Sequence, residues 1–129
     1  MTVAIDFDEV ALARAVERLS DAERDALPFG VVKLDAAGAV TFYSKTEAVQ
    51  SGFKKRPAVG RDFFLEIAPC MNTPALKGRI DAARQAGKVD VEIGWVGDFD
   101  DPDAEMRIRA QSAADGGLWI FLQRDDASD

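Results

Sequence analysis

The chain has 129 residues, of which 47% are hydrophobic and 30% charged, and its formal net charge is −7. This length suits one domain with its own core, and the negative charge argues against binding to a nucleic-acid backbone. With no histidine and one cysteine, the sequence excludes histidine-based hydrolysis, histidine-ligated metals and an internal disulfide. It shows no basic leader and no apolar run of ~20 residues, so we expect a cytoplasmic protein that binds neither membrane nor nucleic acid.

The N-terminal stretch predicts two short helices. Residues 9–19 carry apolar side chains at the spacing of an amphipathic helix. Ser20, followed three residues later by Glu23, has the pattern of a capping box, and Pro28 ends this second element. We therefore expect residues 1–27 to form a helical cap that lies ahead of a sheet.

The next stretch predicts a β-hairpin and a helical crossing. Residues 29–34 and 39–43 are rich in β-branched and aromatic side chains and flank a short turn. Residues 44–59 suit short helices and loops that cross one face of a sheet. Asp62 stands where it can cap a short turn over residues 63–67.

The second half predicts one helix and three strands. Pro74 begins the helix and Gly87 ends it. Alternating apolar and polar side chains predict strands at residues 89–93, 106–109 and 118–122. The acidic loop 98–103 lacks the glycine and the final glutamate of a calcium loop, so we predict no metal site.

The order of these elements predicts the fold class. Strands joined by hairpins favour an antiparallel sheet, and the helices of residues 44–86 would cover one face of it and enclose a pocket. We expect an α+β fold with a core at residues 28–125 and a flexible tail at 126–129.

Particular residues at particular places make the chain resemble the photoactive yellow protein family over nearly its whole length. The resemblance rests on Leu27-Pro28-Phe29-Gly30, Leu34-Asp35 with Gly38, Tyr43 with Glu47, Val59-Gly60-Arg61-Asp62-Phe63-Phe64, Ala68-Pro69-Cys70 and Trp119-Ile120-Phe121-Leu122-Gln123-Arg124. It implies a PAS fold, a five-stranded antiparallel sheet with helices on one face and an N-terminal helical cap. It also implies a p-coumaric acid (4-hydroxycinnamic acid) chromophore, held as a thioester and isomerised by blue light.

The resemblance also implies roles for single residues. Cys70 would be the attachment point, and Tyr43 and Glu47 would hydrogen-bond the chromophore phenolate. Ser51 takes the place of a threonine that supports the tyrosine. The residues expected to line the pocket are Phe63, Ile67, Ala68 and Pro69.

Two positions depart from the family pattern. Phe53 stands where the best-known members have an arginine that partly shields the chromophore from solvent. Trp95 matches a tyrosine near the chromophore. Both residues count among the candidate pocket residues, and both bear on whether the pocket still accommodates the chromophore.

The residues by themselves leave alternatives open. A lone cysteine such as Cys70 is often a small buried hydrophobe, and a glutamate such as Glu47 is usually a solvated surface charge. If Glu47 is buried, however, desolvation favours its neutral form, which donates a hydrogen bond. The phenol of Tyr43 is a donor at neutral pH as well, and two donors on one oxygen stabilise a phenolate.

Two functions therefore remain. The first is a blue-light sensor in which photoisomerisation is followed by proton transfer from Glu47, release of the N-terminal cap and signalling to an unknown downstream protein. The second is a PAS-like ligand-binding or protein-interaction module without a chromophore, which Phe53 and Trp95 keep open. We expect no enzymatic activity, because a cysteine-dependent enzyme needs a base that this sequence does not supply.

Overall fold

The computed structural model describes residues 5–50, 58–96 and 105–124. Ser51, Phe53, the acidic loop 98–103 and the tail lie outside these ranges, as do the side chains of Cys70 and Trp95. Within the described ranges no helix is both long and apolar enough to cross a membrane.

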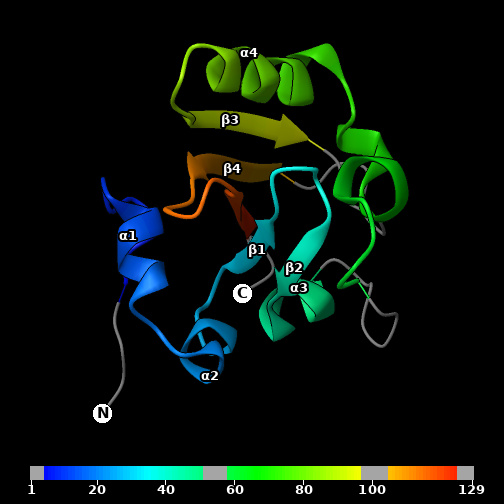
Figure 1. Cartoon of the computed structure of the whole chain (residues 1–129). Helices are drawn as coiled ribbons and strands as arrows, with labels where there is room; N and C mark the ends of the chain where they lie inside the picture. Colours follow the sequence, from blue (N-terminus) through cyan, green and yellow to red (C-terminus); the bar gives the residue numbers. More distant parts are fainter. Residues whose placement is uncertain (1–4, 51–57, 97–104, 125–129) are drawn as a thin grey trace.

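Helices and strands follow the order expected from the sequence (Figure 1). The elements are α1 (Leu12–Glu17), α2 (Asp21–Asp25), β1 (Gly30–Leu34), β2 (Val40–Tyr43), α3 (Lys45–Gln50), the π-helical turn η1 (Phe63–Ile67), the 3₁₀ turn η2 (Pro69–Met71), the π-helical turn η3 (Pro74–Gly78), α4 (Arg79–Gln85), β3 (Asp90–Val96), β4 (Glu105–Ser112) and β5 (Leu118–Arg124).

The five strands form one antiparallel sheet in the order β2-β1-β5-β4-β3. The first and last strands of the chain therefore pair at its centre, where Val32 of β1 lies opposite Ile120 of β5. This confirms the predicted five-stranded antiparallel sheet of the α+β class.

Each face of the sheet carries its own hydrophobic core. Leu118, Ile120 and Leu122 of β5 join the core under the crossing segment, residues 58–89. Trp119 and Phe121 point the other way, into a core built with residues 5–29. The period of two along a strand produces this division, and it places the N-terminal helices on the face opposite the crossing segment.

Local signals in the sequence set most of the element ends. The Ser20 hydroxyl accepts from the Glu23 N–H and the Glu23 carboxylate accepts from the Ser20 N–H, so the predicted capping box is confirmed. Asp62 caps η1 by accepting from the Leu65 N–H at 2.9 Å, also as predicted. Gly87 follows α4 with φ +105°, a conformation that glycine adopts without strain.

The helix expected from Pro74 onward differs from the prediction in its first turn. The Gly78 N–H donates to the Thr73 carbonyl five residues back, at 3.1 Å, so this turn is a π-turn and the α-helix begins only at Arg79. Glycine has a low helix propensity, and its position at the junction suits the change of helix type.

Candidate functional site

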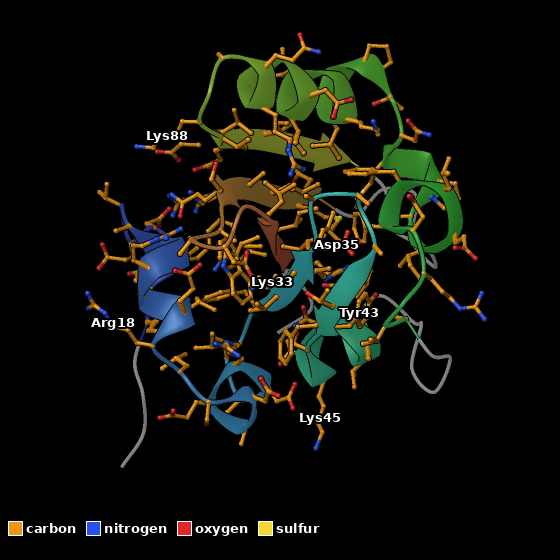
Figure 2. The ribbon with its side chains drawn as sticks, in the orientation of Figure 1. Arg18, Lys33, Asp35, Tyr43, Lys45 and Lys88 are labelled. Atoms are coloured by element: carbon orange, nitrogen blue, oxygen red, sulfur yellow. The ribbon has the colours of Figure 1, made fainter. Side chains whose placement is uncertain are left out.

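The site is built where β2 passes into α3. Figure 2 shows Tyr43 at the end of β2, beside α3. Buried Ser44 follows, and its hydroxyl accepts from the Glu47 N–H at 3.1 Å and from the Val31 N–H at 3.0 Å. Sequence analysis missed Ser44, although a serine three residues before a glutamate is a cap signal. Its two contacts hold the first turn of α3 on β1.

Tyr43 and Glu47 lie on the same face of the sheet. Tyr43 pairs with Val32, and both contribute to the core under the crossing segment. Glu47 lies against Gly30, two residues before Val32 on the same strand face. Two residues along a strand span about 7 Å, so the phenol and the carboxylate are both within reach of one aromatic group.

Glu47 is buried and paired. Its side chain is 3% exposed and accepts two hydrogen bonds from Arg124, whose side chain is 10% exposed. Nη1 donates to Oε1 at 2.7 Å and Nη2 donates to Oε2 at 3.0 Å, a bidentate arrangement. The interpretation of Glu47 as a solvated surface charge is therefore wrong, and Arg124 is a partner that the sequence did not indicate.

Gly30 makes this pair possible. A Cβ at position 30 would lie 2.0 Å from Glu47 Oε1 and 3.0 Å from its Cδ. No side chain other than hydrogen therefore fits beneath the carboxylate. The close approach explains a glycine inside a central strand, where it otherwise costs stability.

An apolar wall completes the described part of the site. Phe63, Ile67 and Ala68 are each about 2% exposed, and they come from η1 and the residue after it. Pro69 was predicted to line the pocket with them, but it is exposed because it begins η2 on the surface side. Cys70 is the next residue of that turn, so its backbone follows directly on the apolar wall.

A row of polar side chains on β4 attaches the N-terminal segment to the opposite face. We call Arg107, Arg109 and Gln111 the β4 polar row. Arg109 is 7% exposed and donates to the carbonyls of Phe7 and Glu9, both at 2.7 Å, and to that of Val10 at 3.4 Å. The alternation of side chains along β4 correctly predicted the face of the sheet on which Arg109 lies, but it did not predict that Arg109 is buried.

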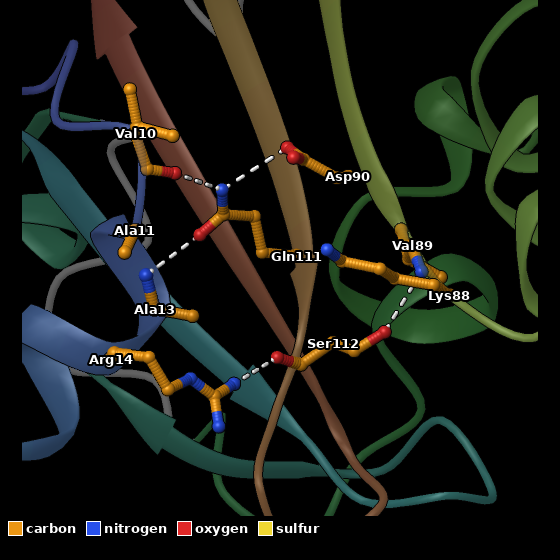
Figure 3. A pocket seen from close by; sticks show the side chains of 9 residues that line it. All are labelled: Val10, Ala11, Ala13, Arg14, Lys88, Val89, Asp90, Gln111 and Ser112. Atoms are coloured by element: carbon orange, nitrogen blue, oxygen red, sulfur yellow. Dashed lines mark hydrogen bonds between the residues drawn. The ribbon is translucent and has the colours of Figure 1, made fainter.

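Gln111 continues this attachment inside a cavity of about 370 Å³ between α1 and the strands β3 and β4 (Figure 3). Its carbonyl oxygen accepts from the Ala13 N–H at 2.7 Å, and its amide donates to the Val10 carbonyl at 2.9 Å and to Asp90 at 3.1 Å. These bonds satisfy the hydrogen-bonding groups of the buried Gln111 amide. We therefore interpret the cavity as part of the contact that holds α1 on the sheet.

Acid is expected to weaken one contact of the β4 polar row. The hydrogen bond from Arg107 holds the pKa of the Asp8 carboxyl below its ordinary value of 3.8. A group whose pKa is lowered by folding stabilises the folded state at pH values above its ordinary pKa. This stabilisation is lost as the pH falls through the lowered pKa. Urea unfolding should therefore show Asp8→Asn less stable than wild type at neutral pH and equal to it in strong acid. A difference that persists unchanged in strong acid would contradict this assignment.

Comparison with solved structures first defines the class. The PAS domain of a protein from Colwellia psychrerythraea is similar with a TM-score of 0.58 at 17% identity, over 79% of this chain and 90% of that one. At this identity the likeness shows the fold alone, so the chain has the PAS fold, as predicted. No family model matches the chain.

Closer relatives define the family. The photoactive yellow protein of Rhodobacter capsulatus is 32% identical over 104 residues, which are 80% of this chain and 84% of that protein. The photoactive yellow protein domain of the sensor histidine kinase Ppr from Rhodospirillum centenum is 35% identical, with a TM-score of 0.78 over 86% of this chain and 98% of that domain. The chain belongs to the photoactive yellow protein family.

Proposed function

We propose that this protein is a blue-light photoreceptor that binds p-coumaric acid as a thioester of Cys70. The observation that carries the proposal is the buried carboxyl of Glu47, which shares a sheet face with the phenol of Tyr43. Arg124 offsets part of the cost of burying this carboxyl, and buried titratable groups of this kind are frequent at functional sites. A carboxyl and a phenol on one face of the sheet are the groups that stabilising a buried phenolate requires.

The residues present fit the chromophore. An aromatic acyl group needs an apolar wall, which Phe63, Ile67 and Ala68 supply. Its phenolate needs donors at the far end, and Tyr43 and a protonated Glu47 are of the right chemical type. We further propose that Ser51, Phe53 and Trp95 complete the surroundings.

When bound, the chromophore supplies blue-light absorption and isomerisation about its double bond. The chain's own part is to hold and move a proton. Protonated Glu47 would donate a hydrogen bond to the phenolate oxygen in the dark, and after illumination it would pass its proton to that oxygen and become a carboxylate. The N-terminal cap, residues 1–27, then loosens from the sheet, and a separate cytoplasmic signalling protein reads the exposed face.

Loading the purified protein tests the proposal. With the anhydride of p-coumaric acid, the Cys70 sulfur should take up one p-coumaroyl group, lose its proton and release p-coumaric acid. We expect an intact-mass gain of one p-coumaroyl group, a visible band and a reversible bleach under blue light. Cys70→Ala should show none of these. In loaded Glu47→Gln the band should move to longer wavelength, because an amide stabilises the phenolate less than a carboxylic acid does.

The second candidate function makes the opposite prediction. A PAS-like ligand-binding or interaction module without a chromophore would give no Cys70-dependent mass gain and no colour. An adduct that forms but does not bleach would also contradict the photoreceptor.

A further inference from the structure

Among the described residues, Arg124 is the cation that reaches the buried carboxylate of Glu47. Arg124 is the last residue of β5, and it shares its strand face with Leu118, Ile120 and Leu122 of the core under the crossing segment. Its guanidinium meets Glu47 through two hydrogen bonds, of 2.7 and 3.0 Å. Gln50 of α3 adds a neutral acceptor at 3.4 Å from Nη1.

The carboxylate that this cation binds is positioned by the strand and the helix around it. The Ser44 hydroxyl accepts from the Glu47 N–H and so holds the backbone of Glu47 in the first turn of α3, and Gly30 lets the carboxylate lie directly on β1. Arginine keeps its proton throughout the physiological pH range. Arg124 therefore brings a permanent positive charge to the described part of the site, and its side chain is largely removed from water.

Counting charges gives this cation a role. In the part of the chain that the structure describes, Glu47 on α3 and Tyr43 on β2 are the titratable groups on this cation's face of the sheet, and the described wall of the crossing segment is apolar. Lys45 of α3 is exposed. Alternation along the strands places Lys33 of β1 and the charged residues of β4, Glu105, Arg107 and Arg109, on the other face. Resting on the proposed function, a bound phenolate beside protonated Glu47 leaves one negative charge, and a neutral phenol beside ionised Glu47 also leaves one. Arg124 balances either arrangement.

We propose that Arg124 is the counter-ion of the photoreceptor site, and that it holds the negative charge on the chromophore in the dark and on Glu47 after proton transfer. Arg124 is then a positioning residue, since it acts through the group that carries the charge. The contact with Glu47 seen in the structure is the arrangement expected after proton transfer. Such a partner stabilises the ionised carboxylate and slows its reprotonation.

Titration of the loaded protein tests this proposal. In Arg124→Gln the bound phenolate loses its counter-ion, so its apparent proton affinity should rise about tenfold or more, which is one pKa unit. Recovery from the bleach should become faster, because ionised Glu47 loses its bidentate hydrogen bonds with the Arg124 cation. Arg124→Lys keeps the charge and should restore most of the titration. The exposed Arg79 on α4 provides the control, and Arg79→Gln should titrate like wild type.

A second measurement needs no chromophore. Urea unfolding of unloaded wild type, Glu47→Gln, Arg124→Gln and the double variant forms a double-mutant cycle. Each single change should lower the folding equilibrium constant about tenfold or more, since it leaves one buried charge or polar group without its partner. In the double variant the folding equilibrium constant should fall by less than the product of the two single-variant factors. If Arg124→Gln does not fold, titrations of loaded Glu47→Gln and of the loaded double variant are compared instead.

The outcomes separate the two proposals. Failure of the wild type to form the Cys70 adduct overturns the photoreceptor and the counter-ion together. An adduct that bleaches normally but titrates identically in wild type, Arg124→Gln and Arg79→Gln overturns the counter-ion alone. Absence of coupling in the unfolding cycle also overturns it.

Discussion

Replacing Gly30 by alanine is expected to destabilise the protein by about 2–4 kcal/mol, the sum of overpacking and a disturbed buried ion pair. The new methyl carbon would lie 2.0 Å from Glu47 Oε1, a distance that no pair of non-bonded atoms tolerates. The Glu47 carboxylate would have to move away from β1, and its bidentate hydrogen bonds with Arg124 would be broken or distorted. Urea unfolding of the unloaded protein measures this loss.

Gly94 of β3 supplies the matched control. It is also a strand glycine, but a Cβ added there meets no atom within 4 Å in the described part of the chain. Gly94→Ala should therefore change the free energy of unfolding by about 0.5 kcal/mol or less. Both variants add one methyl group to a strand glycine, but only the methyl group at position 30 meets the Glu47 carboxylate. Equal effects would contradict the proposed role of Gly30.

A second background isolates the clash itself. In Glu47→Ala the carboxylate that a Gly30 methyl group would strike is gone. Adding Gly30→Ala to this variant should lower the free energy of unfolding by about 1 kcal/mol or less, because little overpacking remains. A loss as large as in the wild-type background would show that Gly30 matters for another reason.

What the sequence predicts well is local. The cap at Ser20, the cap at Asp62 and the end of α4 at Gly87 each depend on atoms within five residues of one another. Strand alternation likewise assigns residues to sheet faces, as it does for Leu118 and Trp119. These signals suffice for the sheet. They do not suffice for the face on which Tyr43 lies, because a register shift in the β1–β2 pair puts Val40 and Tyr43 into the same core.

What the sequence does not indicate depends on distant residues. Glu47 and Arg124 are 77 positions apart, and no spacing rule connects a helix in the first half with the end of the last strand. The burial of Arg109 has the same origin. Its place on β4 predicts a face but not the covering segment, whose carbonyls lie 99 to 102 positions away.

This difference changes the expected course of the light response. From the sequence alone, an ionised Glu47 would lie in an apolar pocket without a charged partner. The free-energy cost of this buried charge would then drive the release of the N-terminal cap. With Arg124 at 2.7 Å, the carboxylate has a partner and much of that cost disappears. In the proposed light response, the extent to which the cap loosens then depends on how firmly the β4 polar row holds it.

Arg109→Met is expected to release the N-terminal segment in the dark and to destabilise the protein by about 2–4 kcal/mol, because it removes hydrogen bonds from a buried charged donor to three backbone carbonyls. Methionine keeps much of the side-chain volume, so the change tests the donors more than the packing. Amide hydrogen exchange followed by mass spectrometry measures the release, in peptides covering residues 5–19.

The site of faster exchange distinguishes a local release from general instability. Local opening should accelerate exchange in residues 5–19 well beyond that in β1 and β5, which form the centre of the sheet. Arg79→Met, an equal change at an exposed position on α4, should leave both regions unchanged. If Arg109→Met accelerates exchange equally everywhere, or not at all in residues 5–19, the β4 polar row does not hold the cap. If it acts as expected, the loaded variant should show a smaller light-induced gain of exchange in residues 5–19 than wild type, because part of the release has already taken place.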